Sequence, residues 1–236
     1  MSLRAWIVLL AALAGALATG RLGVWQLDRA RQKIELHEAQ LARSALPPLD
    51  AQTLAHTGEA AAAQEHRRVV LQGQWLPRYS VYLDNRQMNG HPGFYLMTPL
   101  QIAPGDVVLV QRGWLPRHTQ DREHLAPTDT PVGTVQIEGR IAPAVARLYE
   151  FDAAASGTIR QNLDVAAFAR ETALALRPLV VVQGGAASEG LLRQWVPAEP
   201  DVSKHYGYAA QWFALSALIT GLYVWFQLIQ PRRRRR

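Results

Sequence analysis

The chain has 236 residues, of which 49% are hydrophobic and 19% charged, a balance typical of one sizeable domain with accessory segments. It contains no cysteine, which excludes disulfides and cysteine-based metal sites. The formal net charge of +6 comes from Arg4, Arg21 and the run 232–236 at the chain ends, so it gives no support for a nucleic-acid-binding face.

The first apolar segment lies between Arg4 and Arg21 and contains 16 uncharged residues. A helix of that length spans about 24 Å, which is short of a bilayer core. If Arg21 snorkels, the helix reaches Trp25, which predicts a transmembrane helix over residues 5–25 after a cytoplasmic N-terminus at 1–4. The small-residue pattern at 16–18 also fits a cleaved signal peptide, and this segment alone leaves both alternatives open.

Residues 26–46 are rich in charge and contain neither glycine nor proline. Leucine or isoleucine recurs at 27, 34, 41 and 46, which predicts a helix that continues out of the membrane. Two prolines at 47 and 48 end this helix, and the alanine-rich stretch to about residue 64 is predicted to be a short helix or a loop.

The hydrophobic pattern then changes from a helical period to alternation, which predicts β-strands. The predicted strands are residues 67–76, 79–86, 93–102, 106–114, 133–141 and 177–183. Asn89-Gly90 indicates a hairpin turn between the second and the third. Residues 162–176 are expected to form a short amphipathic helix. The sequence therefore predicts a mostly antiparallel, barrel-like β-sheet domain with a few short helices over residues 47–203.

A second apolar segment covers residues 205–230, which carry no formal charge and are followed by Pro231 and five arginines. Aromatic residues lie at both of its ends, about 25 to 30 Å apart in a helix, as in the two aromatic belts of a membrane span. The pattern predicts a transmembrane helix over 204–230 and a cytoplasmic basic tail over 231–236.

The arginine tail predicts that both termini are cytoplasmic and that the β-rich domain is extracytoplasmic. The flanks of the first span favour the opposite orientation, because Arg21, Arg29, Arg31 and Lys33 outnumber Arg4. We give the tail more weight, because arginine clusters beside a span resist translocation. Such a tail is also able to bind anionic lipid or nucleic acid, but its position after a span favours a topology anchor.

Motifs for ordinary enzyme chemistry are absent from the sequence, which has neither a phosphate-binding G-x-x-x-x-G-K-[ST] nor a G-x-S-x-G nucleophile elbow. His118, Asp121 and His124 are three residues apart and form a candidate metal site, but a fourth ligand is missing. Because no nucleophile, base and orienting group come together, we predict that the protein is not an enzyme.

His205 is the strongest candidate for a functional side chain. It shares a helical face with Tyr208 and Trp212, at the predicted boundary between lipid and water. A histidine at this depth is suited to bind haem iron, with the propionates reaching Lys204 or Arg193 in the headgroup region. The alternative is an interfacial histidine with no partner.

Five segments of the chain resemble, in the same order, the surfeit-locus family of cytochrome c oxidase assembly proteins, called Shy in yeast. These are RLGVWQLDRARQK from 21, NRQMNGHPGFYLMTPL from 85, VVLVQRGWLP from 107, IRQNLDVAAFA from 159 and KHYGYAAQWFALSA from 204. The resemblance covers nearly the whole chain. It is closest to the bacterial type, because only four residues precede the first apolar run, where mitochondrial members carry a presequence.

The resemblance implies an α+β protein of the bacterial cytoplasmic membrane, in which two transmembrane helices flank a mostly antiparallel, barrel-like domain. It also implies that the first span is retained. The expected function is binding of haem a and aid in its insertion into oxidase subunit I. Subunit I and haem a synthase are the expected protein partners, and no nucleic acid is expected.

The same resemblance points to His205 as the ligand of the haem a iron. Our hypothesis adds Trp25, Tyr208 and Trp212 as walls of the site and Lys204 as a partner of the propionates.

Two alternatives remain. In the first, the chain is a membrane-tethered scaffold that stabilises a subunit I intermediate without handling haem, and Gly93, Trp114 and the segment 112–116 matter more than His205. In the second, the chain is an extracytoplasmic enzyme that uses His118 and His124.

Overall fold

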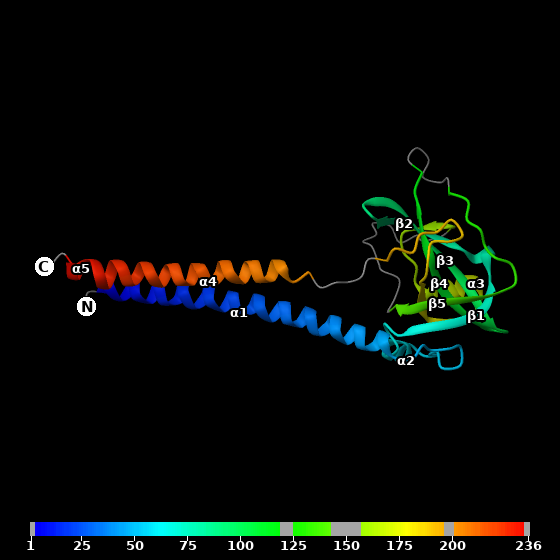
Figure 1. The fold of residues 1–236 in the computed structure, drawn as a ribbon, viewed down its shortest axis with the longest axis horizontal. Helices are drawn as coiled ribbons and strands as arrows, with labels where there is room; N and C mark the ends of the chain where they lie inside the picture. The colour runs from blue at the N-terminus through cyan, green and yellow to red at the C-terminus, as the bar shows by residue number, and fades with distance from the viewer. Residues whose placement is uncertain (1–2, 119–124, 143–156, 196–200, 234–236) are drawn as a thin grey trace. The chain divides into compact units, whose positions relative to one another are not determined.

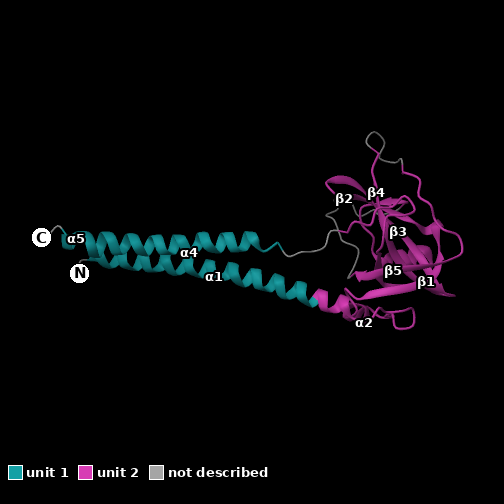
Figure 2. Ribbon diagram, viewed as in Figure 1, with its two compact units in different colours: residues 1–39, 198–236 teal, residues 40–197 magenta. Residues whose placement is uncertain are grey.

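The computed structural model describes residues 3–118, 125–142, 157–195 and 201–233 (Figure 1). The chain divides into two compact units (Figure 2). Unit 1 comprises residues 1–39 and 198–236, and unit 2 comprises residues 40–197. Unit 1 contains two long helical segments, and unit 2 is built on a β-sheet.

Helix α1 runs without interruption from Leu3 to Ala45. It covers both segments that the sequence predicts to be helical, 5–25 and 26–46. Alanine and leucine, two strong helix formers, dominate its first half, and Pro47 follows its last turn. The helix therefore ends where the two prolines begin.

The C-terminal helical segment consists of α4 (Ser203–Tyr223), a π-helical stretch η2 (Val224–Ile229) and α5 (Gln230–Arg233). Pro231 has no backbone N–H, and its ring conflicts with a carbonyl one turn earlier. The backbone N–H of Gln230 bonds to the carbonyl of Trp225, five residues back. The wider turn is the usual way in which a helix absorbs such a local irregularity.

Both helical segments are long and apolar enough to cross a membrane. In their most apolar windows only 11% of the α1 residues and none of those in the C-terminal segment are buried inside the protein. A core helix of a soluble domain would instead be covered by its neighbours. Length, composition and exposure thus point to membrane association of unit 1.

The two helices of unit 1 pack along one face each. The least exposed positions recur at alternating intervals of three and four residues, which is the spacing of two helices that pack side by side. On α1 this series comprises Ala5, Leu9, Ala12, Ala16, Thr19, Gly23, Gln26 and Ala30, and on α4 it comprises His205, Ala209, Trp212, Ser216, Ile219 and Tyr223. Half-buried residues of α1 also include Gly15, Gly20, Ile34, His37 and Gln40. The α1 face is made largely of small residues, which let two backbones approach closely.

Unit 2 is a seven-stranded sheet in the part of the chain that the structure describes. Its strands are β1 (Arg68–Trp75), β2 (Val81–Met88), β3 (His91–Ala103), β4 (Asp106–Pro116), β5 (Thr134–Ala142), β6 (Ile159–Arg160) and β7 (Leu176–Gln183). The order is β1-β5-β7-β4-β3-β2-β6, and β1 also pairs with the end of β3. That pairing closes β1, β5, β7, β4 and β3 into a barrel, and β2 and β6 extend it on one side.

The prediction of a mostly antiparallel, barrel-like sheet is confirmed. Two pairings differ, because β4 pairs with β7 and β2 pairs with β6 in parallel. The predicted hairpin at Asn89-Gly90 is also confirmed, since Met88 pairs with His91 and both turn residues have positive φ, at 52° and 79°. That combination is the type I′ turn that Asn-Gly favours.

Alternate residues of the central strands face two different hydrophobic clusters. Val108 and Val110 of β4 join a cluster inside the barrel, which residues from the segment 49–61 complete. Leu109 faces a second cluster, which contains Phe168 of helix α3 (Val165–Thr172). Neighbouring side chains of a strand point to opposite faces of the sheet, which explains the period of two in the sequence. In β4 both faces are buried.

In its described residues, unit 2 also contains three short helical elements: α2 (Gly58–Ala63), η1 (Pro77–Tyr79) and α3. The predicted helix over 162–176 is shorter in the structure. Asp164 caps its start by accepting a hydrogen bond from the N–H of Ala167 at 2.8 Å, and Ala173 ends it with a left-handed φ of 54°. The remaining residues enter β7.

Candidate functional site

His205 lies in the first turn of α4, and its ring contacts the middle of α1. Its Nδ1 atom is 2.7 Å from Oε1 of Gln26. Both residues are half-buried and lie on the facing sides of the two helices. The imidazole is therefore held against the neighbouring helix within unit 1.

With Oε1 of Gln26 facing the ring, Nδ1 of His205 is the donor, because an amide oxygen only accepts hydrogen bonds. In a neutral ring that donates through Nδ1, Nε2 keeps its lone pair. No residue that the structure describes makes a hydrogen bond to Nε2. The arrangement is the one found for metal-binding histidines, in which one nitrogen donates to an oxygen and the other is available to a metal.

Close packing of the helices continues one to two turns away from this contact. The ring of Phe213 lies against Gly23, where an added Cβ would come within 2.6 Å of the ring. Further along, the hydroxyl of Ser216 donates to the carbonyl of Ala16 at 2.8 Å. The two helices are thus in close contact on this side, and His205 lies at one end of the contact.

The aromatic residues predicted to form walls of the site lie on different faces. Trp212 is half-buried on the face that includes His205, whereas Tyr208 is 53% exposed. Trp25 is 47% exposed, and the guanidinium of Arg29, one turn later, lies 5.5 Å from its ring centroid. Of the three, Trp212 is the one on the packed face with His205.

Lys204 is largely exposed, and its Nζ lies 3.4 Å from a carboxylate oxygen of Asp201. The Ser203 hydroxyl, at 2.6 Å, and the Lys204 ammonium both bond to this carboxylate, and they hold the pKa of Asp201 below its ordinary range. The exposed ammonium of Lys204 still has N–H donors that face solvent. It is therefore able to contact an anionic group at the start of this helix.

Arg193, the second residue considered for the propionates, belongs to the interior of unit 2. Its side chain is 3% exposed and donates to the carbonyls of Arg112 and Ala186, to Ser188 and to Glu189. The fully buried Arg112 bonds to the same Glu189 carboxylate at 2.7 Å. These bonds commit Arg193 to stabilising the fold.

Gly93 and Trp114, which the scaffold alternative singles out, are buried in the sheet. The Trp114 ring lies over Gly93, where an added Cβ would be 2.5 Å from the ring and 2.3 Å from the Leu115 carbonyl oxygen. The indole N–H donates to the carbonyl of Arg86 at 2.8 Å. Only glycine fits beneath this ring, so both residues support the pairing of β3 with β4.

Of the candidate metal site, His118 is described and exposed, whereas Asp121 and His124 lie outside the described residues. Among the described residues, no group of three or more histidines and carboxylates lies close enough to hold a metal ion. That site stays a prediction from the sequence.

The sequence pattern of the SURF1 family matches residues 13–217, which include most of α1, the whole barrel and most of α4. The chain belongs to the SURF1 family. The match thus contains both Gln26 and His205, and it confirms the family resemblance that the sequence motifs indicate.

Among curated relatives, the Arabidopsis thaliana "Surfeit locus protein 1" is 34% identical over 127 residues, covering 50% of this chain and 36% of the relative. The yeast "Cytochrome oxidase assembly protein SHY1" is 30% identical over 95 residues, covering 40% and 24%. A "SURF1-like protein" of Mycobacterium bovis is 32% identical over 123 residues, covering 51% and 44%. The matched segments span less than half of each relative, and the bacterial match agrees with the bacterial type.

Gln26 is the site residue of this SURF1-family chain that sequence reasoning missed. The signal is its position, because it continues the series Thr19, Gly23, Ala30 that faces α4. The sequence pattern favoured Trp25 instead, because it is an aromatic residue at the end of the predicted span. Trp25 is one residue away from Gln26 and lies on another side of the helix.

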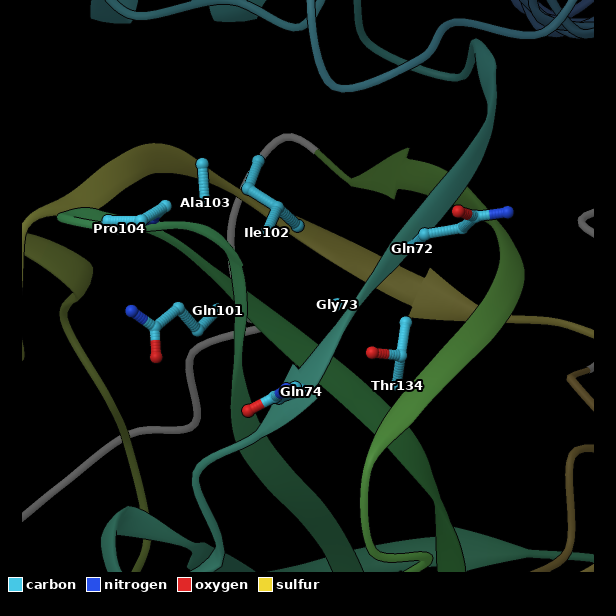
Figure 3. Close-up of a pocket in the computed structure, with 8 residues that line it drawn as sticks. All are labelled: Gln72, Gly73, Gln74, Gln101, Ile102, Ala103, Pro104 and Thr134. Carbon is cyan, nitrogen blue, oxygen red and sulfur yellow. The ribbon is translucent and has the colours of Figure 1, made fainter.

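A separate hollow of about 390 Å³ lies in unit 2 of the SURF1-family chain, beside the seam between β1 and β3 (Figure 3). The amides of Gln72, Gln74 and Gln101 line it. An added Cβ on Gly73 would meet the carbonyl oxygen of Gln101 at 2.4 Å, so glycine is required where the two strands meet. None of the predicted site residues lines this hollow.

Proposed function

We propose that this chain is an assembly factor for haem-copper cytochrome c oxidase that holds haem a through His205 and aids its insertion into subunit I. One observation carries the proposal: Nδ1 of His205 lies 2.7 Å from Oε1 of Gln26, an arrangement in which the neutral ring donates through Nδ1 and leaves Nε2 unprotonated. That nitrogen is the form of imidazole that binds haem iron.

Membership of the SURF1 family supports the wider role in oxidase biogenesis. The yeast relative is named a cytochrome oxidase assembly protein, and the match to it reaches 30% identity. Because the matched segment is a minority of that relative, the transfer of its role to this chain is part of the proposal. Subunit I as recipient and haem a synthase as supplier are the partners that haem a insertion requires.

The surroundings of His205 suit a flat, apolar cargo with anionic edges. Exposed Tyr206 and Tyr208 offer apolar faces to the surrounding lipid, and the exposed Lys204 offers a cation for a propionate. A single histidine ligand also suits transient holding, because a carrier that binds too tightly does not release its cargo.

The proposed setting is the bacterial cytoplasmic membrane, which α1 and α4 cross. In this proposal the arginine tail is cytoplasmic, so both termini are cytoplasmic and unit 2 is extracytoplasmic. His205 opens α4, so this topology puts it at the outer face of the membrane. Both helices have the length and composition that this topology needs.

The test compares the full chain with His205→Ala and with His91→Ala, each purified in detergent from cells that make haem a. His91 is an exposed hairpin residue of unit 2, so its variant controls for the loss of an imidazole. We expect the absorption bands of haem a in the unaltered chain and in His91→Ala, and their loss in His205→Ala. Equal haem a in all three proteins would reject the ligand role and leave the scaffold alternative.

A further inference from the structure

We infer that Gln26 is the positioning residue for His205: it fixes the tautomer and orientation of the ring so that Nε2 meets the haem iron. This inference rests on the proposed function. It assigns a role on α1 to a site whose ligand lies on α4, so both helices contribute to binding.

The contact between His205 and Gln26 has the geometry that a positioning role requires. The 2.7 Å distance from Nδ1 of His205 to Oε1 of Gln26 is that of a strong hydrogen bond. Both side chains are half-buried on the packed faces of α1 and α4, where competition from water is reduced. The ring is therefore held by a partner on the neighbouring helix.

The second step concerns the electronic effect of that bond. A hydrogen bond from Nδ1–H to an oxygen makes the opposite nitrogen a better electron donor to a metal. While Oε1 of Gln26 faces the ring, the bond also favours the tautomer with Nδ1 protonated over the one in which Nε2 is protonated and unable to ligate. Loss of such an outer partner typically costs about 10- to 100-fold in metal affinity.

A purely structural role would make Gln26 only a clamp between the helices. The packing of Phe213 on Gly23 and the bond from Ser216 to Ala16 already join α1 to α4 without it. A clamp and a positioning residue therefore differ in one respect: only the second changes the properties of the iron–histidine bond.

The experiment uses the full chain in detergent with three variants. Gln26→Leu removes the acceptor at similar size, Gln26→Glu keeps an acceptor and strengthens it, and Gln211→Leu is the control. Gln211 is an exposed residue of α4 with no hydrogen-bond partner among the described residues. Each protein is titrated with haem a, and its iron–histidine stretching frequency is recorded in the ferrous state by resonance Raman spectroscopy.

We expect Gln26→Leu to bind haem a about 10- to 100-fold more weakly and to lower the iron–histidine frequency. Gln26→Glu should restore binding and raise the frequency above that of the unaltered chain, because a carboxylate is the stronger acceptor. Gln211→Leu should match the unaltered chain in both measurements. In the haem-free protein, the ¹⁵N shifts of His205 should show a protonated Nδ1, and a mixture of tautomers in Gln26→Leu.

The inference fails if Gln26→Leu binds haem a with unchanged affinity and frequency while His205→Ala loses it. It also fails if Gln26→Glu and Gln26→Leu give the same frequency, because the acceptor would then have no effect on the ring. Retention of haem a by His205→Ala would instead reject the proposed function itself, and the ¹⁵N shifts would still report whether Gln26 sets the tautomer.

Discussion

Asp106, at the start of β4, shows how single charged residues hold unit 2 together. Its carboxylate accepts two hydrogen bonds from the buried Arg177, at 2.8 Å from Nε and 2.5 Å from Nη2. These bonds hold the pKa of Asp106 below its ordinary range. Arg177 also donates to the carbonyls of Leu54 and Ala51, so the ion pair fixes the segment that completes the barrel interior.

We predict that Asp106→Asn destabilises the full chain by about 1.5 to 3 kcal/mol at pH 7, the range for hydrogen bonds to charged groups. A carboxylate with a lowered pKa contributes its stability above the ordinary pKa and loses it as the pH falls through the lowered value. The difference between the two proteins should therefore shrink below about pH 4. Urea unfolding at pH 7 and pH 3 measures it.

Glu59→Gln, at an exposed glutamate of α2, is the control for the loss of a carboxylate and should change stability little at either pH. A difference between Asp106→Asn and the unaltered chain that is the same at both pH values would contradict the role of the ion pair.

At the residue scale the sequence indicated His205 but neither its partner nor the buried arginines. A histidine at the start of an uncharged segment is visible in a linear pattern, whereas Gln26 lies 179 positions away and meets it only after the helices pack. Arg112, Arg177 and Arg193 look like surface charges in the sequence, because arginine is mostly exposed unless paired. Their burial depends on backbone acceptors outside their own strands, which a linear pattern does not show.

Among the elements, the packing of α1 against α4 depends on a small residue where Phe213 meets α1. Gly23 leaves room for the ring of Phe213, and any larger side chain there displaces the ring or separates the helices. The contact lies next to the His205–Gln26 bond, so spacing of the helices and geometry of the site are linked.

The chain has no cysteine, which allows a direct test of this packing. An added Cβ on Gly20 would lie 3.7 Å from the Ser216 hydroxyl, so we predict that the pair Gly20→Cys and Ser216→Cys forms a disulfide under mild oxidation. Adding Gly23→Leu should reduce its yield several-fold, as shown by gel mobility after cleavage of the chain between the helices. An unchanged yield would show that Gly23 does not set the spacing.

Most strands could be predicted from the alternation of hydrophobic and polar residues and from the turn residues between them, because these are local properties of the sequence. The two-residue strand β6 was missed, since it is too short to show a period. The parallel pairing of β4 with β7 and the closure of β1 on β3 were also not predicted, because they join segments far apart in the chain and no local signal encodes register between them.

For the whole molecule, the proposed function depends on the topology of the two spans. The arginine tail and the flanks of α1 predict opposite orientations, and we propose that the tail decides. Single cysteines distinguish the two. Val132 is fully exposed in unit 2, and Arg232 follows the C-terminal span.

We expect a membrane-impermeant thiol reagent to label Val132→Cys in intact spheroplasts and Arg232→Cys only after permeabilisation. The cysteine-free parent chain is the background control. Labelling of Arg232→Cys but not of Val132→Cys in intact spheroplasts would reverse the proposed orientation and place unit 2 in the cytoplasm.

Titration of the purified full chain with haem a shows directly whether His205 holds the cofactor. We expect saturable binding of one haem a per chain with the absorption spectrum of a histidine-ligated iron, and loss of that spectrum in His205→Ala. Binding of haem a with the same affinity and the same spectrum after His205→Ala would show that His205 is not the ligand.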